Sequence, residues 1–257
     1  MIELFFAELR RSWIQIIRYP FEATGGIFIT TCLFYGLFLG AKYVAGPNFQ
    51  LGDRFDSVVI GYVLWALTLF IMSNTTSQLQ NEAQTGTLEQ VFLSLYGAVK
   101  VFFVRAIASL AIQLALVISI LIIILSLTGS RLNFPPLLIF PLTTIILGAY
   151  GISFVMAALV LLFKRIGQVV NLSQFAFLFV LATPSEAWTG WGQVWRWLVP
   201  MTGGAGLLRD LMARGENLNW WELSLAFVNG LVYLSIGLLV FRFSEIQTKK
   251  QGKLGGY

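Results

Sequence analysis

The stretch FFVRAIASLAIQLALVISILIIILSLT, residues 102–128, contains a single charged residue, Arg105. A helix that spans a bilayer needs about 20 consecutive, mostly apolar residues. This stretch exceeds that length, and its arginine lies close to one end, where a long basic side chain can reach the membrane surface. The sequence therefore predicts a transmembrane helix at 102–128.

Outward from this stretch, further segments meet the same criterion, at 23–45, 57–79, 136–163, 167–183 and 222–242. The composition agrees, because 57% of the residues are hydrophobic and only 11% are charged, against about 25% charged in soluble domains. The mean hydropathy is +0.79. We expect an all-α, polytopic membrane protein in which six transmembrane helices form one domain over residues 1–257.

The positive charges favour one orientation. Six spans put both termini on one side, and cytoplasmic loops carry an excess of lysine and arginine. With a cytoplasmic N-terminus, eleven of the 17 basic residues fall inside. They are Arg10, Arg11, Arg18, Lys100, Arg105, Lys164, Arg165, Arg242, Lys249, Lys250 and Lys253. The prediction is a multi-pass protein of the cell inner (plasma) membrane with both termini cytoplasmic.

Several classes of site are excluded by composition. The chain has no histidine and one cysteine, Cys32, which rules out histidine-based zinc sites, Ser/His and Cys/His nucleophile pairs and an intrachain disulfide. No metal site is expected. The net charge of +5 fits anionic lipid headgroups rather than nucleic acid, because the basic residues lie beside apolar spans.

Residues 2–19 predict an amphipathic helix in the cytoplasmic membrane interface, which makes 1–20 an interfacial segment. Its apolar residues fall within an arc of about 120° at 100° per residue. They are Ile2, Phe5, Phe6, Leu9, Trp13, Ile16 and Ile17. Pro20 ends this helix. The alternative is that this first helix packs against the other spans.

Residues 184–221 contain six of the eight tryptophans. Indole rings prefer the membrane interface, and Pro184 and Pro200 interrupt any helix. We expect 184–214 to form short helices that insert part-way from the external side, with Arg209 and Asp210 near the external surface. The alternative is an ordinary aromatic belt.

The segment NEAQTGTLEQVFLSLYGAVK, residues 81–100, is polar at its start. Gly86 permits a sharp turn, and Thr87 with Gln90 forms a capping-box pattern. Apolar residues then repeat at helical spacing, at Leu88, Val91, Phe92 and Leu95. The pattern predicts a short cytoplasmic helix within 81–97, ended by Gly97.

Glu82 and Glu89 are expected on the exposed flank of this short helix. From the pattern alone, the helix is either a docking element for a partner protein or a plain connector between the second and third spans.

Motifs for catalysis and energy conversion are missing from the sequence. No G-x-x-x-x-G-K-S/T phosphate-binding loop occurs, and no acidic residue lies mid-span to drive proton-coupled transport. We therefore predict that the chain is not an enzyme, binds no cofactor and takes its energy from another chain. The amides inside the spans are interpreted as helix-packing groups; they are Asn74, Gln113, Asn171, Gln174 and Asn229.

Gly36 and Gly40 form a G-x-x-x-G pattern in the first span, which permits close approach of two helices. The partner helix belongs either to a second subunit or to this same chain.

Two segments carry a family resemblance. NEAQTGTLEQVFLS is similar to the E-x-x-x-G-T-L-E-Q-L segment that follows the second span of ABC-2 type transporter permeases. PMTGGAGLLRDLMARG resembles the segment before their last span. The resemblance extends over the whole chain, although the Ser-Pro pair that often follows the first motif is absent.

The resemblance implies roles for particular residues. The helix within 81–97 would be the coupling helix that receives an ATPase subunit, through Glu82, Gly86, Thr87, Leu88, Glu89 and Gln90. The re-entrant segment 184–214 would include Pro184, Trp188, Trp191, Pro200, Thr202, Arg209 and Asp210. Gly36 and Gly40 would contact the second permease subunit.

The function implied is a membrane-spanning permease of an ATP-binding cassette exporter. It would work as a homodimer with two copies of an ABC ATPase that bind ATP and Mg, and would move a lipid, drug-like or other amphiphilic substrate outward. The alternatives are a passive channel or a membrane assembly scaffold, and, less favoured, an intramembrane enzyme.

Overall fold

The computed structural model describes residues 2–45, 53–93, 97–130, 132–163, 166–184 and 190–250, and all regular secondary structure within these ranges is helical. Within these ranges, four helical segments are long and apolar enough to cross a membrane, judged by length and composition: Phe55–Gln84, Ala98–Thr128, Pro136–Phe163 and Trp220–Lys250. Two shorter apolar stretches occur, Thr24–Gly40 and Gly167–Ala182. The prediction of a multi-pass, all-α membrane protein is thus confirmed.

The predicted spans match the helices to within a few residues at most ends. They correspond to α2 (Pro20–Ala45), α3 (Asp53–Gln84), α5 (Ala98–Thr128), the short 3-10 helix η1 (Pro136–Leu138) with α6 (Ile139–Phe163), α7 (Gly167–Ala182) and α10 (Trp220–Lys250). The largest difference is at α10, which continues eight residues beyond the predicted end at 242. The added residues are mostly polar, so the length of the apolar stretch does not predict that the helix continues through them.

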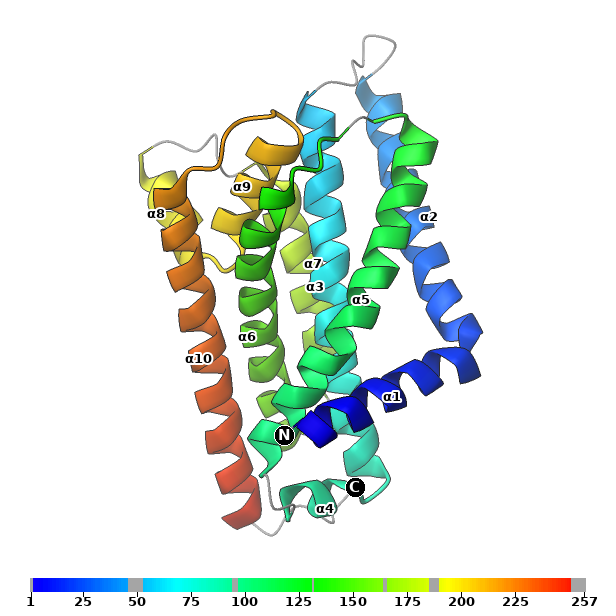
Figure 1. The fold of residues 1–257 in the computed structure, drawn as a ribbon, viewed down its shortest axis with the longest axis vertical. Helices are drawn as coiled ribbons and strands as arrows, with labels where there is room; N and C mark the ends of the chain where they lie inside the picture. The colour runs from blue at the N-terminus through cyan, green and yellow to red at the C-terminus, as the bar shows by residue number, and fades with distance from the viewer. Residues whose placement is uncertain are drawn as a thin grey trace.

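The first helix, α1 (Ile2–Arg18), is separated from α2 by Tyr19, and α2 begins at Pro20, a position that favours proline. Figure 1 shows α1 lying across the bundle, beside α5. Its apolar side chains Phe6, Trp13 and Ile17 are exposed, whereas Glu8 is buried against the bundle. One side of this helix therefore packs against the bundle, as the alternative interpretation predicted, and Phe6, Trp13 and Ile17 stay open.

The bundle has two distinct ends (Figure 1). The end with α1, α4 (Leu88–Phe92) and the C-terminal part of α10 is here called the α4 end. The end with α8 (Trp191–Leu198), α9 (Thr202–Met212) and the start of α10 is called the α9 end. Between them α3 lies centrally and contacts α5, α6, α7 and α9.

The most extensive helix pair is α6 with α10. Glycines allow their backbones to touch: a Cβ atom added at Gly151 would lie 2.7 Å from the Leu234 nitrogen, and one added at Gly230 would lie 2.8 Å from the Thr144 carbonyl oxygen. Small residues serve this purpose in membrane helix pairs, because dispersion contacts replace the missing hydrophobic driving force.

Candidate functional site

The sharp turn predicted at Gly86 is present at the end of α3. Gly86 has φ +73°, a left-handed conformation that glycine adopts without strain. The chain then forms α4, Leu88–Phe92, which is shorter than the predicted 81–97 because residues 81–84 belong to the last turn of α3. The prediction that Gly97 ends α4 is wrong. Gly97 lies immediately before α5 and has φ +74°.

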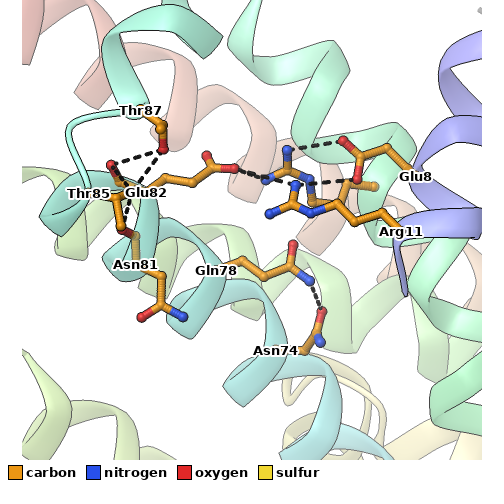
Figure 2. Close-up of polar contacts among 9 residues, drawn as sticks. Glu8, Arg11, Asn74, Gln78, Asn81, Glu82, Thr85 and Thr87 are labelled. Atoms are coloured by element: carbon orange, nitrogen blue, oxygen red, sulfur yellow. Dashed lines mark hydrogen bonds and ion pairs between the residues drawn. The ribbon is translucent and has the colours of Figure 1, made fainter. Parts of the chain in front are cut away.

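Thr87 directs its hydroxyl back toward α3. The hydroxyl donates to the Glu82 carbonyl oxygen at 3.4 Å and lies 3.0 Å from the Thr85 hydroxyl (Figure 2). The backbone N–H of Gln90 donates to the Thr87 carbonyl oxygen at 3.1 Å. Among the contacts of the described residues, the Thr87 hydroxyl therefore contacts the end of α3, and the Gln90 backbone N–H is bonded to the Thr87 carbonyl oxygen instead of the hydroxyl oxygen that a capping box would use.

The α4 segment has a buried side and an exposed side. Leu88 and Phe92 are buried in the core, as the helical spacing predicted. Gly86, Thr87 and Gln90 are exposed, and Leu93, directly after the helix, is 84% exposed. The side chain of Glu89 lies outside the described residues. Among the side chains that the structure describes, these exposed positions form a small surface from which the apolar side chain of Leu93 protrudes.

Glu82 does not belong to that surface, and the prediction of an exposed Glu82 is wrong. Its side chain is buried and forms an ion pair with Arg105 of α5. Arg105 in turn donates to the Glu8 carboxylate of α1 at 3.0 Å. The expectation that Arg105 reaches the membrane surface is also wrong, because its side chain is only 5% exposed.

These residues form a charge-balanced group with Arg11, here called the ion cluster: Glu8, Arg11, Glu82 and Arg105. Arg11 is about half exposed and lies 3.7 Å from both carboxylates. Figure 2 shows Arg11 and Glu8 of α1 beside Glu82 at the end of α3, and Arg105 of α5 is paired with both glutamates. Because a buried charge without a partner is costly, this cluster ties α1, α3 and α5 together next to α4.

α10 also reaches α4. The Lys249 ammonium lies 3.5 Å from the Phe92 carbonyl oxygen and 5.1 Å from the centre of the Phe92 ring. It is paired with Glu245 one turn earlier, at 2.6 Å. The short helix is therefore in contact with the ends of α3, α5 and α10.

At the α9 end, the predicted breaks at both prolines are present. α7 ends at Ala182, before Pro184, and α8 and α9 are separated at residues 199–201 around Pro200. The Thr202 hydroxyl donates to the Val199 carbonyl oxygen at 2.8 Å and closes the corner. Two short helices thus replace one continuous helix.

Arg209 was expected near the external surface; it lies on α9, and its side chain is fully buried. Its guanidinium donates to the Ser57 carbonyl oxygen of α3 at 3.1 Å and to the Leu181 carbonyl oxygen of α7. Asp210 is partly exposed and pairs with Arg214. Arg209 therefore joins α9 to the start of α3 and the end of α7.

The tryptophans of this segment divide by exposure. Trp191, Trp195, Trp220 and Trp221 are exposed, whereas Trp197 packs under Arg196 and its carbonyl oxygen accepts from Asn229 at 2.7 Å. Trp188 lies outside the described residues. Exposed indoles gathered at one end fit a membrane interface.

The sequence profile of the ABC-2 type transporter family matches residues 3–213, from α1 to the residue after α9. This chain belongs to the ABC-2 type transporter family. It is a permease component of a transporter, and permeases of this family generally work with an ABC ATPase partner. A comparison with curated proteins found no match.

In this ABC-2 permease, Gly36 and Gly40 face away from the rest of the chain. A Cβ atom added at either glycine would meet nothing within 4 Å, and both residues are exposed. Within the described part of the chain, the alternative that they serve packing inside this chain finds no contact to support it.

Sequence reasoning missed Glu8 and misplaced Arg105. A signal was present, because an arginine inside a predicted span normally faces the protein interior and pairs with an acidic group. The acids that it meets lie 23 and 97 residues away along the chain, a separation that periodicity does not report.

Proposed function

We infer that this ABC-2 permease is the membrane subunit of an ATP-driven exporter. A separate ABC ATPase would bind ATP and Mg and dock on the exposed surface of the α4 segment, and this chain would bind no cofactor and catalyse no reaction of its own. The observation that carries the proposal is the α4 segment itself. It combines a buried apolar side with an exposed side that includes Leu93, 84% of which is open.

The contacts of α4 supply a route for the force. A push on α4 acts on α3 through the Gly86 turn and on α10 through Lys249. The ion cluster begins at Glu82, four residues before Gly86, so α1 and α5 would move with the end of α3. Closure of the ATPase subunits would thereby shift several helices between two arrangements.

The membrane topology follows the same proposal. α2 and α7 would cross the membrane together with the four longer segments, which gives six spans with the α4 end in the cytoplasm. Arg10, Arg11 and Arg18 on α1 and Lys249 and Lys250 on α10 support this orientation by the positive-inside rule. The helices α8 and α9 would insert from the outside, where the inserted backbone is shielded because nearly all of α9 is buried.

Docking is tested by reversing the charge of a glutamate in α4 and, as a control, of a glutamate in α1 at the same end of the bundle. Glu89→Lys in α4 is expected to reduce co-purification with the ATPase and to lower transport-coupled ATP hydrolysis about tenfold. Leu93→Asp is expected to do the same, because it places a charge on the apolar contact. Glu3→Lys, on the exposed start of α1, is the control. Unchanged co-purification of the Glu89 and Leu93 variants would remove docking from the proposal.

We place the second permease subunit against Gly36 and Gly40 of α2, as a homodimer, because these glycines are open in the single chain. Gly36→Leu is expected to shift the solubilised protein from dimer to monomer, since a bulky side chain prevents close helix approach. Gly25→Leu, also open, is the control on the same helix. Light scattering after size exclusion measures the change, and a stable dimer of the Gly36 variant would move the interface elsewhere.

A further inference from the structure

Two adjoining cavities of different chemistry lie along α3. The first, here called the polar cavity, has a volume of about 280 Å³ and lies among α1, α2, α3 and α5. The second, the apolar cavity, has a volume of about 250 Å³ and lies among α2, α3 and α7. Gly26 and Phe70 line both. Together they reach the size range of small-molecule sites in proteins.

The polar cavity is lined by uncharged hydrogen-bonding groups together with apolar side chains, among them Phe70, Ile112 and Leu116. Four serines contribute, and the side-chain amides are Gln15, Asn74, Gln78, Asn81 and Gln113. On α3 the polar positions recur with helical spacing, so they share one face. Figure 2 shows Asn74, Gln78 and Asn81 following one another along α3, with the Gln78 amide bonded to Asn74 at 2.8 Å. No charged side chain lines this cavity among the described residues.

The apolar cavity continues from Phe70 toward Trp65. Its lining includes Ile29, Leu33 and Phe175, and its surface is almost entirely apolar. Trp65 is held in place because its indole nitrogen donates to the Gln174 carbonyl oxygen at 2.7 Å. From Asn81 to Trp65 the two linings follow α3 for about 24 Å, at 1.5 Å per residue.

We propose that the two cavities form one binding site for an amphiphile with an uncharged, hydroxyl- or amide-bearing head group and an alkyl tail. Amide side chains donate and accept, so they match groups that also do both. A charged head group would lose its hydration without gaining a counter-charge there, which is unfavourable. The head lies in the polar cavity and the tail passes Gly26 into the apolar cavity. This inference rests on the proposed exporter function and names its substrate class.

Gly26 is the point at which the site can be closed. A Cβ atom there would lie 3.5 Å from the Phe70 ring, an ordinary contact, so alanine fits. Leucine would fill the junction between the cavities. The adjacent Gly25 has nothing within 4 Å of an added Cβ atom, so Gly25→Leu adds the same side chain to the same helix without closing the junction.

The test measures binding to the purified permease alone, in lipid nanodiscs and without nucleotide. The probe is a dodecyl maltoside with two bromine atoms in its tail, which quench the fluorescence of a nearby tryptophan. The signal is the part of this quenching that is present in the parent protein and absent in Trp65→Phe. We expect saturable quenching that is lost in Gly26→Leu and kept in Gly26→Ala and Gly25→Leu. The same brominated tail with a trimethylammonium head is expected to bind about tenfold more weakly. The double variant Asn74→Leu/Gln78→Leu should lower the maltoside affinity.

Each other outcome overturns a defined part of the proposal. Equal or tighter binding of the ammonium probe overturns the head-group assignment. Quenching that persists in Gly26→Leu, in protein that remains monodisperse, overturns the site and leaves only annular lipid contact. Because no ATPase is present, these results are independent of the docking test, and failure of docking alone leaves the binding site in place.

Discussion

Replacing Gly237 with alanine is expected to prevent α6 and α10 from packing and to remove most of the folded permease from the membrane fraction. A Cβ atom at Gly237 would overlap the carbonyl oxygen of Gly151 on α6. Backbone atoms cannot move aside as a flexible side chain can, so the two helices would have to separate along the most extensive helix pair of the bundle. We expect the free energy of unfolding to fall by at least about 3 kcal/mol, which is typical of severe packing defects.

Whether a glycine-to-alanine change lowers or raises stability shows whether helix packing or helix propensity dominates at that position. Alanine favours a helix over glycine by about 1 kcal/mol, so the same change at an open glycine should be neutral or stabilising. Gly25→Ala is the control, because its added Cβ atom meets nothing within 4 Å. The yield of monodisperse protein and its thermal midpoint measure both variants. A Gly237→Ala protein as stable as the parent would contradict the close approach of α6 and α10.

The glycines also show what the sequence could and could not predict. The G-x-x-x-G pattern at Gly36 and Gly40 pointed to α2, yet close packing within the chain occurs at other glycines, among them Gly151, Gly230 and Gly237. Spacing along one helix says which residues share a face, but not which helix that face meets. The partner is decided by the three-dimensional arrangement.

The helices that coincide with the predicted spans could be located from the sequence for a physical reason. In a bilayer, backbone groups must be bonded within a helix, so a long apolar stretch has few alternatives. The end of α5 at Thr128, followed by Gly129 with φ +71°, agrees with the predicted limit. Polar segments lack this constraint, which is why the helix expected over 81–97 divides between the end of α3 and the five residues of α4.

The prediction for the ion cluster concerns its only deeply buried cation. Arg105→Met is expected to lower the free energy of unfolding by about 3 to 5 kcal/mol, the cost of removing one member of a buried ion pair. Glu8 and Glu82 would remain buried with Arg11 alone, which is half exposed and 3.7 Å from each. Thermal unfolding of the purified permease should begin roughly 10 °C lower. Arg10→Met, on the exposed side of α1, is the control and should change little.

Two further variants separate charge from geometry at this site. Arg105→Lys keeps the positive charge but not the fork through which Nη1 meets Glu82 and Nη2 meets Glu8, so an intermediate loss is expected. Adding Glu82→Gln to Arg105→Met should recover part of the stability, because one stranded carboxylate is removed. If the Arg105→Met and Arg10→Met variants unfold at the same temperature, the ion cluster does not stabilise the packing of α1, α3 and α5. If Arg105→Met melts early and Glu82→Gln restores nothing, the cost comes from lost side-chain packing, including the contact between Arg105 and the Phe102 ring at 5.2 Å, and not from unpaired charge.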